Sequence, residues 1–147
     1  MIENQIPTLS RILYIDDEPD IREVARIALE VVGGFVVEVC ESGEAALVSG
    51  EGFAPDLILL DVMMPGMDGP QTMQSLRAIA ALAPVPVVFF TAKAQRSEIA
   101  ELLALGAVDV LGKPFDPMTI GQALHAIWAR HHGGMPDPVT RLSSYRS

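Results

Sequence analysis

Polar residues follow several apolar stretches of this chain, at positions where side chains that do chemistry are often found. They form an acidic cluster after the first stretch and stand singly after later ones: Asp16, Asp17 and Glu18; Asp61; Thr91; and Lys113. Carboxylates that lie close together repel one another unless a cation occupies the space between them. Oxygen ligands of this type suit Mg²⁺. If the fold brings these groups together, the set predicts a Mg²⁺ site beside a hydroxyl and an ammonium group.

A simpler explanation of the acidic residues is that each one only caps the helix that follows it. Capping accounts for Asp17 or Glu18 taken alone. It does not account for carboxylates, a hydroxyl and an ammonium group that all stand at strand ends. We therefore favour a shared site over separate caps.

The elements that would position these residues can be read from the spacing of apolar residues. Short apolar runs predict five strands, at 11–15, 35–40, 57–60, 85–90 and 108–111. Helical spacing, with capping and stop residues, predicts five helices, at 19–32, 42–49, 70–81, 97–105 and 116–131. Alternating strands and helices with short connections predict an α/β fold, a doubly wound five-stranded parallel sheet with five helices. Ligands of such sheets bind at the carboxyl ends of the strands, so the polar residues should share one edge.

The composition narrows the classes of protein that the chain can be. It has 147 residues, half of them hydrophobic, and a formal net charge of −9, which fits one globular domain and disfavours direct binding of nucleic acid. It has neither a secretory signal nor an apolar run long enough to cross a membrane, so we expect a soluble, cytoplasmic protein. We expect a folded domain at 10–132 between a flexible N-terminus, 1–9, and a flexible Gly/Pro-rich tail, 133–147. Arg11, Arg22, Arg26 and Arg77 are expected to be solvated surface charges.

Four segments, in this order, make the chain resemble the receiver domain of two-component response regulators, the family that includes CheY. They are ILYIDDEPDI (12–21), LILLDVMMPGMDG (57–69), VVFFTAK (87–93) and VLGKPF (110–115). The resemblance runs from about residue 11 to residue 131. It implies the flavodoxin-like fold of CheY and a protein that is switched by phosphorylation.

The resemblance also implies a role for each polar residue. Asp61 would accept a phosphoryl group from the phosphohistidine of a sensor histidine kinase or a phosphotransfer protein. Mg²⁺ would be held by Asp16, Asp17, Asp61 and the backbone carbonyl of Met63. The ammonium of Lys113 would pair with the phosphoryl oxygens.

Two further positions concern the way in which phosphorylation would be communicated. By resemblance, the hydroxyl of Thr91 would bond the phosphoryl group, and a cis peptide before Pro114 would aim Lys113 into the site. Receivers commonly carry an aromatic residue three positions before this lysine, where the present chain has Val110. We therefore expect a switch that does not depend on an aromatic ring at that position.

The function expected from the resemblance is signalling rather than catalysis. The protein would at most phosphorylate itself from small donors and dephosphorylate itself. It would bind a downstream protein through the fourth helix, fifth strand and fifth helix, as a monomer or weak dimer, standing alone or cut from a longer regulator.

Other functional classes fit the sequence less well. The first alternative is an unphosphorylated interaction module, but all the acidic, Thr and Lys positions are present. An aspartate-based phosphatase of the haloacid dehalogenase type needs an Asp two residues after its nucleophile, where Met63 stands. A flavodoxin-like nucleotide binder is disfavoured because no glycine-rich loop follows the first strand.

Overall fold

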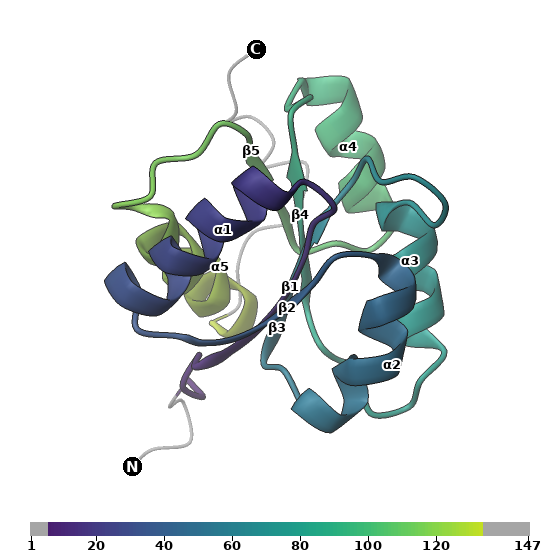
Figure 1. The fold of residues 1–147 in the computed structure, drawn as a ribbon, viewed down its shortest axis with the longest axis horizontal. Helices are drawn as coiled ribbons and strands as arrows, with labels where there is room; N and C mark the ends of the chain where they lie inside the picture. The colour runs from purple at the N-terminus through teal and green to yellow at the C-terminus, as the bar shows by residue number, and fades with distance from the viewer. Residues whose placement is uncertain (1–5, 134–147) are drawn as a thin grey trace.

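The structure, a computed structural model, describes residues 6–133 as a parallel sheet with helices on both faces (Figure 1). The strands are β1 (Arg11–Ile15), β2 (Val36–Cys40), β3 (Leu57–Asp61), β4 (Val87–Thr91) and β5 (Asp109–Gly112). The helices are α1 (Pro19–Ile27), continued by the π-helical turn η1 (Ala28–Val32), α2 (Gly43–Phe53), α3 (Gly69–Arg77), α4 (Arg96–Ala104) and α5 (Ile120–His132). The strand order is β2-β1-β3-β4-β5. The predicted doubly wound fold is confirmed.

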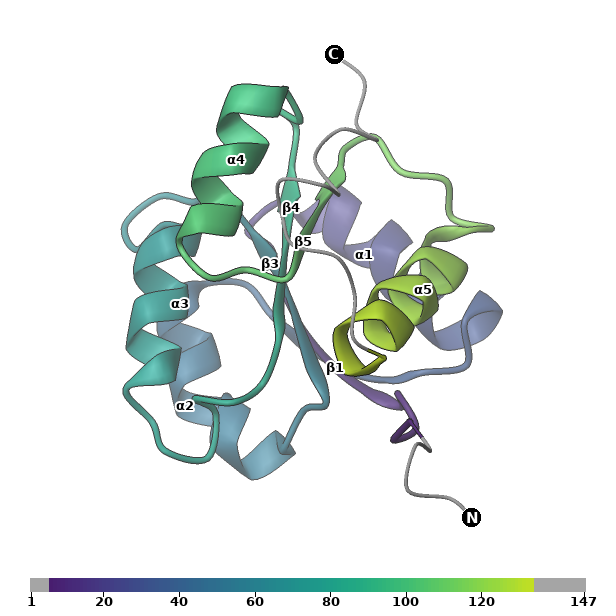
Figure 2. The same cartoon turned by 180° about the vertical axis from the view of Figure 1, so that it is seen from behind.

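The helices divide into two layers, seen from opposite sides in Figures 1 and 2. Helices α1 and α5 cover one face of the sheet, and α2, α3 and α4 cover the other. Alternate residues of β1 enter two separate cores, Leu13 and Ile15 on one face and Ile12 and Tyr14 on the other. All five residues of β3 are buried, as an unbroken apolar run predicts for a strand covered on both faces.

The strands extend through the two functional positions at their carboxyl ends. The sequence predicted that β3 stops before Asp61 and β4 before Thr91, but both residues belong to the strands. The parallel ladder continues past them, because Val62 N donates to Phe90 O (3.1 Å) and Lys113 N donates to Thr91 O (2.7 Å). The backbones of Asp61 and Thr91 are therefore held by the sheet rather than by a loop.

Three predicted helix boundaries are wrong. Helix α2 starts after its predicted cap, Ser42, but continues through Gly50 to Phe53, because that glycine lets the helix pack closely on Leu13 and Leu82. Helix α3 ends at Arg77 rather than at residue 81, because the chain after Arg77 tightens into i→i−3 hydrogen bonds. Helix α5 begins at Ile120 rather than 116, because the side chain of Asp116 accepts from Met118 N and holds a turn.

Part of the predicted flexible N-terminus is packed against the domain. Leu9 is buried in the core shared with α1 and α5. The indole Nε1 of Trp128 donates to the carbonyl of Pro7 (2.6 Å). Residues 1–5 and 134–147, which include nearly all of the predicted tail, lie outside the described residues. Within residues 6–133, no helix is long and apolar enough to cross a membrane.

Three of the four arginines expected to be solvated surface charges instead bind backbone carbonyls. Arg11 donates to Phe53 O, Arg22 to Asp16 O, and Arg77 to Leu105 O and Gly106 O. Only Arg26 matches the expectation, since it pairs with Glu23 and Glu30 on the outside of the same helix. Arg77 therefore ties the end of α3 to the loop that follows α4.

Gly69, the first residue of α3, allows the turn after Asp61 to close tightly. A Cβ at Gly69 would lie 2.5 Å from Asp61 O and 2.8 Å from Val62 Cα. We expect Gly69→Ala to lower the free energy of unfolding by about 1–3 kcal/mol, measured by urea denaturation. Gly52→Ala is the control, because a Cβ there would meet nothing within 4 Å apart from its chain neighbours and the backbone of its own helix, and it should stabilise the protein by roughly 0.5 kcal/mol. Equal effects of the two substitutions would contradict the steric explanation.

Candidate functional site

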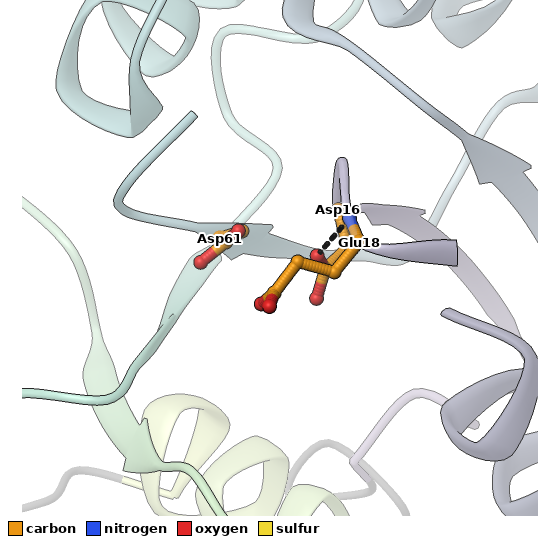
Figure 3. A group of neighbouring side chains, drawn as sticks. All are labelled: Asp16, Glu18 and Asp61. Carbon is orange, nitrogen blue, oxygen red and sulfur yellow. Dashed lines mark hydrogen bonds between the residues drawn. The ribbon is translucent and has the colours of Figure 1, made fainter. Parts of the chain in front are cut away.

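Three carboxylates meet at the carboxyl edge of the sheet, as Figure 3 shows. Asp16 follows β1, Glu18 lies two residues further on, and Asp61 ends β3. One carboxylate oxygen from each lies within 4.8 Å of the others. Asp16 and Asp61 are buried and Glu18 is exposed. The predicted convergence of acidic residues on one edge is therefore observed, with Glu18 as its third member.

Asp16 is held in place by several donors. Its Oδ2 accepts from the hydroxyl of Tyr14 (2.8 Å), and its Oδ1 accepts from the backbone N–H of Glu18 (3.0 Å). Burial, and then the charge of Asp16, raise the pKa of Tyr14, so this hydroxyl remains a donor. The buried carboxylate of Asp16 thus has a fixed orientation.

Lys113 places its ammonium among the three carboxylates. Its Nζ lies 2.9 Å from Asp16 Oδ2, 3.1 Å from Glu18 Oε1 and 3.3 Å from Asp61 Oδ1. The Lys113–Pro114 peptide is cis, as predicted. Burial lowers the pKa of Lys113, but the hydrogen bond to Asp16 and the charges of the two aspartates outweigh it, so the pKa is raised. Lys113 therefore carries a positive charge at this edge at neutral pH.

The carboxyl group of Asp61 has an unusual proton affinity in this arrangement. Burial, followed by the charge of Asp16, raises the pKa of Asp61 to about 7, against the opposing effect of Lys113. One ammonium does not neutralise the surrounding negative charge. A further cation would favour the ionised form of Asp61.

The acidic cluster differs in detail from the predicted metal ligands. Asp17 is not one of the three converging residues, but its Oδ1 is buried and has no hydrogen-bond partner. Such an orphaned oxygen is costly unless a cation or donor reaches it. Glu18 is the N-cap residue of α1, yet its side chain makes no capping hydrogen bond. The capping alternative is therefore wrong for Glu18, and the oxygen donors present fit a hard divalent cation such as Mg²⁺.

The remaining predicted residues surround this cluster. Thr91 is buried at the end of β4, and its Oγ1 accepts from Lys93 N (3.0 Å). Met63 is 64% exposed, two residues after Asp61. Val110 lies in β5 and is buried in the core on the α2–α4 face of the sheet. The strand next to Asp61 therefore carries the hydroxyl of Thr91. Val110 is an apolar side chain at the position where receivers commonly carry an aromatic one.

Comparison with known proteins assigns the chain to a family. The family model described as the response regulator receiver domain matches residues 12–125. The chain belongs to the response regulator receiver domain family. The acidic pocket of Asp16, Glu18 and Asp61, with Lys113 beside it, therefore lies at the carboxyl edge of a receiver domain.

Individual relatives agree with this assignment. The receiver is 40% identical over 133 residues to the DNA-binding response regulator MtrA of Mycolicibacterium smegmatis, a match that covers 90% of this chain and 55% of that protein. It is 42% identical over 108 residues to protein-glutamate methylesterase/protein-glutamine glutaminase 3 of Rhodospirillum rubrum, covering 72% of this chain and 28% of that protein. The receiver spans about half the length of relatives such as MtrA.

A solved structure shows the same fold. The chemotaxis protein CheY4 of Vibrio cholerae superposes with a TM-score of 0.75 and 28% sequence identity, covering 82% of this chain and 99% of that one. The receiver is therefore similar to a chemotaxis protein that consists almost wholly of the matched domain. Two-component signalling is the process to which the family belongs.

Proposed function

We propose that this receiver is a phosphorylation-switched signalling domain in which Asp61 is the phosphoacceptor. The observation that carries the proposal is the position of Asp61, buried at the end of β3 with the Lys113 ammonium 3.3 Å from its Oδ1. A rigidly held carboxylate beside a fixed cation suits attack on an anionic phosphoryl group, since such reactions depend on positioning and charge stabilisation. The donor would be the phosphohistidine of a histidine kinase or phosphotransfer protein.

The transfer forms one bond and breaks one. A carboxylate oxygen of Asp61 bonds to phosphorus as the bond from phosphorus to the histidine nitrogen breaks, and that nitrogen keeps the electron pair. The ammonium of Lys113, a compact cation, would pair with the negatively charged phosphoryl oxygens. The product is an acyl phosphate on the receiver, and the domain acts as a phosphoacceptor rather than as an enzyme with a separate substrate.

The metal proposed for this site is Mg²⁺, held by Asp16, Asp17, Asp61 and the backbone carbonyl of Met63. Glu18 adds a fourth acidic side chain near the same point. When bound, Mg²⁺ would offset the negative charge that opposes the approach of the phosphoryl group. The orphaned Asp17 Oδ1 supports this ligand set.

Removal of the metal gives a direct test of the proposed function. With Mg²⁺, incubation with acetyl phosphate or a phosphorylated histidine kinase should add one phosphoryl group, seen by intact-protein mass spectrometry. With excess EDTA the modified fraction should fall to background, because Lys113 alone leaves the cluster negatively charged. Full modification in EDTA would contradict the metal proposal, and no modification in Mg²⁺ from any donor would favour an unphosphorylated interaction module.

The switch that follows phosphorylation should centre on Thr91. Phosphoryl oxygens on Asp61 would draw the Thr91 hydroxyl away from Lys93 N, its present donor, and move the loop that leads into α4. Val110 is branched at Cβ, small and buried, and cannot make the excursion of an aromatic ring. The output face proposed for a downstream protein is therefore α4, β5 and α5.

This mechanism predicts a particular pattern of NMR changes. On addition of beryllofluoride and Mg²⁺, the largest amide shifts should fall at 63–68 and 91–97, while Val110 keeps one side-chain rotamer. A shift of the population from one conformation to the other needs a few kcal/mol of differential stabilisation, which new hydrogen bonds and ion pairs from Thr91 and Lys113 can supply. A rotamer change at Val110 with Thr91 unmoved would refute it.

A further inference from the structure

A small cavity lies beside the phosphoacceptor edge, between α4 and the residues that follow β3. Its volume is about 260 Å³, and much of its wall is apolar, formed by Val62, Pro70, Leu102 and Leu105. Clefts that hold drug-sized molecules measure roughly 300–1,000 Å³. The cavity is therefore of a size for one side chain rather than for a whole cofactor.

Two acidic residues of α4, Glu98 and Glu101, line the same cavity. Oε1 of Glu98 is shut off from solvent and has no hydrogen-bond partner. Among residues 6–133, neither acid takes part in an ion pair, although Lys93 lines the cavity as well. A carboxylate that has lost water at one oxygen without gaining a donor is stabilised by a nearby cation.

We propose that this cavity receives an aliphatic cation, the Lys or Arg side chain of a partner protein. The apolar wall suits the methylene stem of such a side chain, and the two glutamates suit its charged head. The formal net charge of −9 also favours the approach of a basic partner.

Occupancy of the cavity is coupled to the phosphoacceptor edge through Thr91. Thr91 and Met63 both line the cavity, and Thr91 is held in its present position by the hydrogen bond from Lys93 N. A side chain packed against this wall stabilises the present conformation, whereas phosphorylation draws Thr91 toward Asp61. Because coupling between two sites is reciprocal, phosphorylation should weaken binding in the cavity. This coupling, unlike the binding itself, rests on the proposed function.

Binding is tested on the unphosphorylated, metal-free protein by NMR titration. The probes are n-butylguanidinium, the neutral analogue 1-pentanol and a blocked Ala-Arg-Ala tripeptide. The guanidinium should shift the amides of Met63, Lys93 and Leu102 and bind at least about five-fold more tightly than the alcohol, and the tripeptide should bind at least as well. Equal affinity for the alcohol overturns the cation preference, and binding of the guanidinium without the tripeptide overturns the assignment to a protein side chain.

Two matched variants separate the role of Glu98 from a general charge effect. Glu98→Gln keeps the shape of the side chain and should weaken guanidinium binding by about five-fold. Glu51→Gln makes the same charge change on the exposed part of α2 and should leave the affinity unchanged. Unchanged binding by Glu98→Gln, or equal losses in both variants, overturns the proposal.

The coupling is tested by repeating the titration in beryllofluoride and Mg²⁺. Affinity for the guanidinium should fall by about five-fold or more, the lower end of typical coupling between sites. If beryllofluoride shifts the amides next to Asp61 but the affinity is unchanged or higher, the coupling is overturned. If beryllofluoride shifts none of those amides, it is the proposed function of Asp61 that fails, and the binding result in the metal-free protein stands by itself.

Discussion

Asp61→Asn is expected to abolish phosphorylation of the protein by acetyl phosphate and by a phosphorylated histidine kinase. The amide keeps the size and shape of the carboxylate but is a far weaker nucleophile, and the neighbouring Lys113 cannot substitute as an acceptor because its ammonium carries no free electron pair. Intact-protein mass spectrometry in Mg²⁺ would show no added phosphoryl group. The fold should be retained, since Asp61 is tied to the sheet by its backbone.

The control for this experiment is a nearby acid outside the cluster. Asp20, in the first turn of α1, is exposed and forms no ion pair among the described residues. Asp20→Asn should be phosphorylated to the same extent as the wild-type protein. Phosphorylation of the Asp61→Asn variant at the wild-type level would place the nucleophile on another residue.

The second large effect that we expect is a change with pH in the free energy of unfolding of the metal-free protein. Without metal, the pKa of Asp61 is raised to about 7, chiefly by burial, whereas in the unfolded chain it is about 4. Between these pH values the native state binds more protons than the unfolded state, so this group makes the free energy of unfolding fall as the pH rises. The fall should level off above about pH 7.

Asp61→Asn removes this titration and should therefore stabilise the metal-free protein at high pH. In EDTA at pH 8, we expect the variant to exceed the wild-type free energy of unfolding by on the order of 2–4 kcal/mol. At pH 4 the two proteins should be nearly equal. Urea denaturation at intervals between pH 4 and pH 8 measures the difference, with Asp20→Asn as the control.

Mg²⁺ should narrow the difference in stability between the two proteins at pH 8. A cation that binds the native state alone stabilises it by an amount that grows with the ratio of its concentration to its dissociation constant, and the wild-type cluster, which offers one more carboxylate than the variant, should bind it more tightly. Wild-type protein should thus gain more from added Mg²⁺ than Asp61→Asn does. The raised pKa of Asp61 would be contradicted by the opposite trend in EDTA. In that case the wild-type free energy of unfolding would rise relative to that of the variant between pH 5 and pH 8.

The sequence determined the order of the elements and the strand ends on which the polar residues stand. Apolar runs of four or five residues, separated by helical spacing, are sufficient for this because a strand buried on both faces needs an unbroken apolar segment. The positions of Asp16, Asp61, Thr91 and Lys113 followed from the rule that parallel strands share a carboxyl edge. Their family resemblance added the expected roles, and the cis Lys113–Pro114 peptide agrees with it.

Helix ends were less predictable because they depend on neighbours that the local sequence does not contain. The helix predicted at 42–49 ends one residue before Gly50, but Leu13 and Leu82 pack where the side chain of Gly50 would be, and the helix continues to Phe53. Arg22 and Arg77 looked like solvated charges, yet each reaches a backbone carbonyl at a loop. Long side chains find such partners only after the loops have been placed.

The membership of the acidic cluster was decided by the tertiary structure alone. Glu18 is exposed and was not predicted as a ligand, but its carboxylate meets Lys113, which lies 95 positions away in the chain. The proton affinity of Asp61 arises from its burial and from Asp16, which is brought beside it by the pairing of β1 with β3. Residue types and their spacing indicate at which edge of the sheet a side chain lies. Distances of about 3 Å between charged atoms, which decide proton affinity and metal binding, are set only when the strands are paired and the side chains are packed.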